Sequence, residues 1–126
     1  MSVLLDTHAF LWWIGDDPRL SRRARSVIAE DHCFVSIASC WEIAIKAGLG
    51  RLESPRPIDR FLQEQLEVNG FTLLPISLGH VSALADLPSH HRDPFDRLLA
   101  VQARLEDVAL VSSNPVFKSY RIKRIW

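Results

Sequence analysis

The segment Val3-Leu4-Leu5-Asp6-Thr7-His8-Ala9-Phe10-Leu11-Trp12-Trp13 sets the pattern from which the rest of the chain can be interpreted. Residues 3–5 form a short apolar run that favours a buried strand, and this strand ends at Asp6. Thr7 is a typical helix N-cap, so we expect a helix from His8 to Trp13. The segment therefore predicts a strand-to-helix turn with an acidic residue at the end of the strand.

The same alternation of short apolar runs and amphipathic segments continues along the chain. Since strands separated by helices form parallel sheets, the sequence predicts an α/β fold with a parallel sheet of about five strands and helices on both faces. A length of 126 residues favours a single domain over residues 1–126. Further strands are expected at 33–36, 71–74, 108–112 and 120–126, and further helices at 20–30, from Ser36 or Ser39 to Gly48 or Gly50, and at 58–67, 78–87 and 93–105.

The bulk composition narrows the classes of function. The 15 basic and 15 acidic residues balance to a formal net charge of zero, which argues against nucleic-acid binding by overall charge. A basic strip near the C-terminus is explained equally well as charge that protects a sheet-edge strand or as contact with an RNA backbone. The strip consists of Lys118, Arg121, Lys123 and Arg124.

Neither a membrane nor an oxidising compartment is indicated. No apolar run is long enough to span a bilayer, and Met1-Ser2-Val3 lacks the basic region of a signal peptide. Cys33 and Cys40 form no CxxC motif, so we interpret both as reduced residues of a cytoplasmic protein without a membrane partner.

The acidic residues in apolar surroundings are the strongest functional signal. Glu42 lies within an apolar helical segment, and Asp93 and Asp96 lie three residues apart in the first turn of another helix, so they share a face. Asp6 and Asn114 each follow a strand, and the carboxyl ends of parallel strands are where ligands bind. We therefore expect these groups to approach one another.

Clustered carboxylates need a positive partner. Two of them ~4 Å apart repel by about 4 kcal/mol at an effective dielectric constant of ~20, against a total stability of only ~5–15 kcal/mol. Mg²⁺ or Mn²⁺ would relieve this repulsion, and phosphodiester hydrolysis is a chemistry that these ions support.

Each acid also has a simpler explanation when taken alone. Asp6 and Asp93 are good helix caps, and Glu42 with Lys46 is a common helical ion pair. The pair His90-His91 is expected to lie in a solvated loop rather than at the rim of a site.

The order of these motifs resembles the PIN-domain family over nearly the whole chain. The strongest match is the segment from His91 to Ala103, which contains Asp93-Pro94-Phe95-Asp96-Arg97. The branch that it resembles comprises the toxin ribonucleases of VapBC-type toxin–antitoxin pairs. The other matching elements are Leu4-Leu5-Asp6-Thr7-His8, Val35-Ser36, Trp41-Glu42-Ile43, Lys46, Gly70-Phe71, Leu74-Pro75-Ile76, His80, Leu110-Val111-Ser112-Ser113-Asn114, Phe117, Tyr120 and Trp126.

The resemblance implies a Mg²⁺- or Mn²⁺-dependent endoribonuclease. Its acidic pocket corresponds to Asp6, Glu42 and Asp96, with Asp93 beside it. An RNA substrate, a cognate antitoxin protein that enters the pocket, and a homodimer are also implied. Supporting roles fall to Asn114, Ser112 and Thr7, and Lys46 or Arg97 is expected to stabilise phosphate.

One departure from the family pattern leaves an alternative function open. The family usually has Thr-x-Asp after the fourth strand, whereas this chain has Ser112-Ser113-Asn114. Asn114 offers a carbonyl oxygen but no charge, so the pocket has one negative charge fewer. The alternative is a weakly active or inactive binding module whose acidic pocket receives a basic partner segment.

Overall fold

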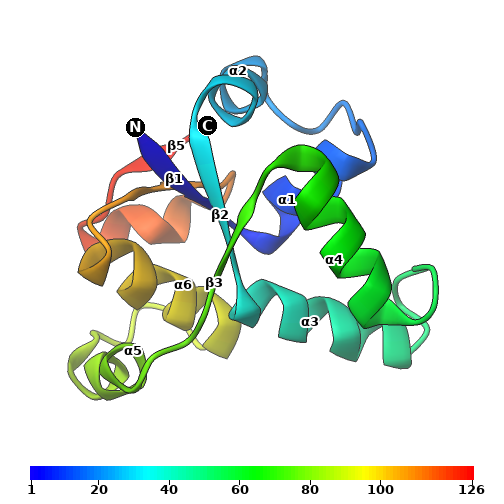
Figure 1. Ribbon diagram of the computed structural model, residues 1–126. Coiled ribbons are helices and arrows are strands. Elements are labelled where there is room, and N and C mark those ends of the chain that lie inside the picture. Colours follow the sequence, from blue (N-terminus) through cyan, green and yellow to red (C-terminus); the bar gives the residue numbers. More distant parts are fainter.

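A computed structural model describes residues 1–126, and its centre is one five-stranded parallel sheet in the order β3-β2-β1-β4-β5 (Figure 1). The central strand β1 lies between β2 and β4, and Leu5 is in register with Val35 on one side and Val111 on the other. The carboxyl ends of these three strands therefore meet at one edge of the sheet. The strands are β1 (Ser2–Leu5), β2 (His32–Ser36), β3 (Thr72–Leu74), β4 (Ala109–Val111) and β5 (Arg124–Ile125).

Six α-helices connect the strands, and polar side chains begin most of them. Ser21, Ser36, Ser77 and Asp93 each accept a hydrogen bond from a backbone N–H of the helix that follows. The helices are α1 (Thr7–Ile14), α2 (Arg22–Glu30), α3 (Ile37–Gly48), α4 (Ile58–Asn69), α5 (Leu78–Ala83) and α6 (Pro94–Leu105), with 3-10 turns at Leu84–Asp86 and Pro115–Tyr120.

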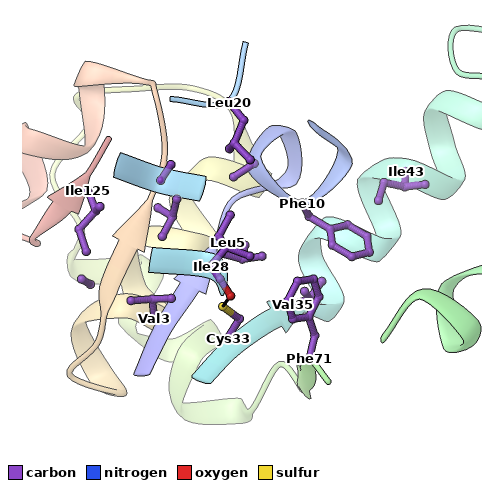
Figure 2. Close-up of a cluster of buried hydrophobic side chains, with 14 of the residues drawn as sticks. Val3, Leu5, Phe10, Leu20, Ile28, Cys33, Val35, Ile43, Phe71 and Ile125 are labelled. Carbon is purple, nitrogen blue, oxygen red and sulfur yellow. Dashed lines mark hydrogen bonds between the residues drawn. The ribbon is translucent and has the colours of Figure 1, made fainter. Parts of the chain in front are cut away.

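Alternate residues of β1 enter two separate hydrophobic cores. Val3 and Leu5 pack on one face with side chains of α1, α2 and α4, as Figure 2 shows in part. Leu4 packs on the other face against α6 and the turn that carries Phe117. The prediction of a parallel sheet covered on both faces is thus confirmed, because period-two alternation divides a strand between two apolar layers.

The structure corrects several expected boundaries. Asp6, not Thr7, caps α1: its Oδ1 accepts the N–H of Ala9 at 2.8 Å. The expected helix at 78–87 ends at Ala83 and continues as a 3-10 turn. The expected strand at 120–126 is reduced to β5, because Arg121 adopts a left-handed conformation with φ of 58° and ends the turn before it.

Both cysteines are free thiols. None of the helices combines the length and apolar character that crossing a membrane requires.

Candidate active site

Asp6 lies at the point where the central strand passes into its first helix. Its residue surface is only 6% exposed. One oxygen of the Asp6 carboxylate caps the N-terminus of α1. The backbone N–H of Asp6 donates to the carbonyl of Val111 at 3.0 Å, and this hydrogen bond joins Asp6 to the end of β4. The nearby Ser112 hydroxyl favours the charged form of the Asp6 carboxylate and so lowers its pKa. Asp6 is therefore held by both central strands at their carboxyl ends.

Glu42 is oriented by groups on two helices. Thr7 at the start of α1 donates its hydroxyl to Glu42 Oε1 at 2.7 Å, and Lys46 on α3 lies 2.9 Å from Oε2. Thr7 also lies 3.0 Å from the Ser39 hydroxyl. These contacts keep the Glu42 side chain, which is 12% exposed, at the sheet edge near Asp6.

The third part of the site is the start of α6. Asp93 Oδ1 accepts the backbone N–H groups of Phe95 and Asp96 at 2.9 and 3.1 Å, so the N-cap interpretation of Asp93 holds. Asp96 Oδ2 lies 2.9 Å from His91 Nε2. His91 is thereby brought into the site, which corrects the expectation of a solvated loop.

The electrostatics differ between the buried Asp6 and the partly buried Asp96. Burial is the main cause that raises the pKa of Asp6, and Glu42 adds to it, while the Ser112 hydroxyl and the hydrogen bond from Ala9 oppose it. Burial, followed by the charges of Asp93 and Asp6, raises the pKa of Asp96 to about 6 despite the His91 hydrogen bond. The charge of Glu42 raises the pKa of Asp6, and the charge of Asp6 raises the pKa of Asp96, so the three carboxylates interact electrostatically.

The closest group of possible metal ligands differs from the expected set. The ligand atoms of His91, Asp93 and Asp96 all lie within 4.8 Å of one another, whereas Asp6 and Glu42 are outside this group. Sequence reasoning missed His91 because it precedes α6 and shares no helical period with Asp96. The one available signal is that His91 lies two residues before the N-cap Asp93. From that position the side chain can fold back onto the first turn of α6, where Asp96 lies.

Ser112 and Asn114 complete the sheet-edge side of the site. Ser112 is buried, its hydroxyl accepts the N–H of Asn114 at 3.0 Å, and its carbonyl accepts a bond from Arg124 at 2.9 Å. Asn114 Oδ1 accepts the N–H of Val116 at 3.0 Å and so begins the 3-10 turn. The strand ends carrying Asp6 and Asn114 are neighbours, as the topology argument predicted.

Lys46 and Arg97, which we expected to contact phosphate, interact with other groups of the protein in this structure. Lys46 pairs with Glu42, and its ammonium group remains at the margin of the acidic pocket. The Arg97 guanidinium donates to the carbonyls of Leu87, Pro88 and His91, so it binds the preceding loop instead of facing the acids.

The donor set fits a hard divalent cation. Asp6, Glu42, Asp93 and Asp96 supply carboxylate oxygens, which Mg²⁺ and Mn²⁺ prefer. Asp6 forms no ion pair with any Lys, Arg or His, although it is the most deeply buried acid. A buried carboxylate without a cationic partner is the feature that a bound cation would compensate.

Comparisons with known proteins identify a matching family and a similar sequence. The PIN domain family matches residues 3–123. Ribonuclease VapC22 of Mycobacterium tuberculosis (strain ATCC 25618 / H37Rv) is 31% identical over 125 residues, which cover 98% of this chain and 95% of that protein.

Solved structures share the fold at low sequence identity. VapBC2 from Rickettsia felis, bound to a DNA fragment from its promoter, superposes with a TM-score of 0.68 at 16% identity, covering 98% of this chain and 97% of that one. DNA-bound VapBC from Salmonella typhimurium gives 0.68 at 16% identity, with 98% and 96% covered. FitAcB from Neisseria gonorrhoeae gives 0.66 at 20% identity, with 97% and 95% covered.

Proposed function

Because the chain belongs to the PIN-domain family, we propose that it is a metal-dependent endoribonuclease and the toxin of a type II toxin–antitoxin pair. The observation that carries this proposal is the convergence of Asp6, Glu42 and Asp96 from three elements at the carboxyl ends of β1, β2 and β4. The similarity to a protein named ribonuclease VapC22 supports the same reaction class.

The acids would hold Mg²⁺ or Mn²⁺ with Asp6 and Asp96 as principal ligands and Glu42 beside them. A divalent cation supplies two things to phosphodiester hydrolysis: it lowers the pKa of a bound water and stabilises negative charge on the phosphate. Thr7 and Lys46 orient Glu42 for this task. Asp93 uses Oδ1 for the helix cap, which leaves its second oxygen to accept a proton released in the pocket.

Single-stranded RNA is the substrate that we assign to the site. Proteins that recognise RNA sequence mostly bind single-stranded loops, whose unstacked bases are accessible, whereas duplex RNA is recognised mainly by shape. Lys46 at the margin of the acidic pocket is the cationic group placed to contact a phosphate there.

Cleavage of a fluorescent single-stranded RNA with Mn²⁺ tests the proposal. We expect activity that EDTA abolishes and that Asp6→Asn eliminates, because asparagine keeps the helix cap but removes the charge. Glu64→Gln, which changes an exposed acid on α4, is the matched control. Activity that survives both EDTA and Asp6→Asn would contradict the assignment.

Asn114 favours the binding module as the second candidate, because it places an uncharged cap where the family usually has an acid. Asn114→Asp separates the two candidates, since aspartate caps the turn equally well and adds one charge. A large gain in Mn²⁺ affinity and cleavage indicates a degenerate pocket, whereas no gain indicates that Asp93 compensates.

The antitoxin partner is supported by the toxin–antitoxin complexes among the structural neighbours. A cleft of about 510 Å³ next to the Glu42–Lys46 pair is lined partly by apolar side chains, which include Leu11, Trp12 and Phe61, and otherwise mainly by polar and charged ones. We propose that an antitoxin segment lies in this cleft and places a basic side chain on the acids. Loss of cleavage when the antitoxin is added, restored by Trp12→Asp, is the expected result.

A homodimer is proposed on the outer face of α3. Trp41 and Ile45 on α3 and Leu49 directly after its end recur every four residues and are 50%, 40% and 62% exposed, so they form an exposed apolar stripe. A second copy would cover this stripe, and light scattering of Ile45→Asp should then give the monomer mass.

The free thiols of Cys33 and Cys40 support a reducing, cytoplasmic location.

A further inference from the structure

His91 contacts the acidic site although it lies outside helix α6. Its Nε2 is 2.9 Å from Asp96 Oδ2. A carboxylate only accepts hydrogen bonds, so Nε2 must carry the hydrogen and donate it. The neighbouring His90 makes no such contact, and its ring lies 5.3 Å from that of Tyr120. One of two adjacent histidines is thus selected for the carboxylate.

The loop that carries His91 is held by Arg97, which directly follows Asp96 on α6. Arg97 Nη1 donates to the carbonyls of Pro88 and His91 at 3.0 and 3.4 Å, and Nη2 donates to that of Leu87 at 3.3 Å. Asp96 and Arg97 are consecutive, so the loop is anchored beside the carboxylate that His91 contacts. These three hydrogen bonds from one guanidinium fix the backbone of the loop from which the His91 imidazole extends.

We propose that His91 is a positioning residue for Asp96, with Arg97 holding the loop that presents it. The imidazole retains Oδ2 of Asp96 and leaves Oδ1 for the cation, so His91 itself contacts neither cation nor substrate. This inference rests on the proposed function, because it assumes that Asp96 is a ligand. Hydrogen-bonded partners of ligating carboxylates commonly affect metal affinity by about 10–100-fold.

Mn²⁺ titration followed by EPR of the free ion tests this role without any substrate. We expect His91→Ala to raise the dissociation constant for Mn²⁺ by about 10–100-fold. His91→Gln should retain most of the affinity, because its amide nitrogen reaches about as far as Nε2. His90→Ala is the matched control, and its affinity should equal that of the wild type. Melting temperatures recorded in EDTA should be similar for all variants.

The outcomes separate the inference from the proposed function. Unchanged affinity in His91→Ala overturns the positioning role, and so does a nitrogen coupling in pulsed EPR, which would make His91 a direct ligand. If His91→Ala does not fold, His91→Asn replaces it, since its shorter amide does not reach Oδ2, and affinity equal to His91→Gln overturns the role. Wild-type protein that neither binds Mn²⁺ nor cleaves RNA overturns the proposed function instead.

Discussion

The Asp96→Asn substitution should make the metal-free protein more stable while it removes metal binding. Burial and the nearby Asp93 raise the pKa of Asp96 to about 6 from 3.8, so the folded protein disfavours the charged form. The folded state binds more protons than the unfolded state between these pH values, and the wild type therefore loses stability as pH rises from about 4 to 6. Asparagine does not titrate and avoids this loss.

The size of the effect follows from that pKa. A rise from 3.8 to about 6 corresponds to about 3 kcal/mol, at about 1.4 kcal/mol for each pH unit. The Asp96 side chain is 22% exposed, and solvent screening reduces the figure to on the order of 1–2 kcal/mol. In a chain of this length, that difference raises the melting temperature by on the order of 5 °C.

Thermal unfolding at pH 8 and at pH 4, each with EDTA or with excess Mn²⁺, measures the effect. In EDTA, Asp96→Asn should melt above the wild type at pH 8, and the two should coincide at pH 4. Mn²⁺ at 100 times its dissociation constant adds about 2.7 kcal/mol to the wild type alone, so the order reverses at pH 8. Glu64→Gln, an exposed change on α4, should follow the wild type throughout.

Two results would refute this reasoning. The first is an Asp96→Asn protein that is no more stable than the wild type at pH 8 in EDTA, which would mean that the carboxylate is not under electrostatic strain. The second is an advantage that persists unchanged at pH 4, which would assign the gain to packing instead of charge.

Three further substitutions examine single contacts. Thr7→Val removes the hydroxyl that orients Glu42, so cleavage and Mn²⁺ affinity should fall by about 10-fold, whereas Thr7→Ser should retain both in the same assays. Tyr120→Phe should raise the free energy of unfolding in urea by on the order of 1 kcal/mol, because the buried Tyr120 hydroxyl has no hydrogen-bond partner in the protein; a loss of stability would contradict this. Ser21→Ala removes the cap of α2 and should lower the urea-derived free energy of unfolding by about 1 kcal/mol, with Ser26→Ala as the control.

Most of the fold could be predicted because its strands and helices have clear periods. The apolar run at residues 3–5 and the serine caps locate elements to within one or two residues. The errors lie where local signals compete. Thr7 and Asp6 are both good caps, and the deciding factor is that Thr7 bonds to Glu42, a residue far away in sequence. The alternation near the C-terminus suggested a longer strand, but the left-handed Arg121 interrupts it.

The candidate site could be predicted in part. The sequence predicted that Asp6 and Asn114 follow strands of a parallel sheet, where ligands bind at the carboxyl ends. That β1 and β4 are neighbours, which brings Asp6 close to Ser112, is known only from the structure. The contact of His91 with Asp96 and the binding of Arg97 to loop carbonyls were not predictable, because both depend on how an irregular loop folds back. The metal-binding roles of the acids stay a prediction.

Asp6 and Asp93 each use a carboxylate oxygen to start a helix, and this has a practical consequence for anyone who wishes to inactivate the protein. Substitution by alanine would remove the N-cap of α1 or α6 and destabilise the protein by about 1 kcal/mol. Loss of toxicity in cells could then result either from misfolding or from lost catalysis, and the experiment would not separate the two. Asparagine retains the helix cap and removes only the negative charge. An inert chain made in this way would retain its shape and serve as bait for recovering bound transcripts intact.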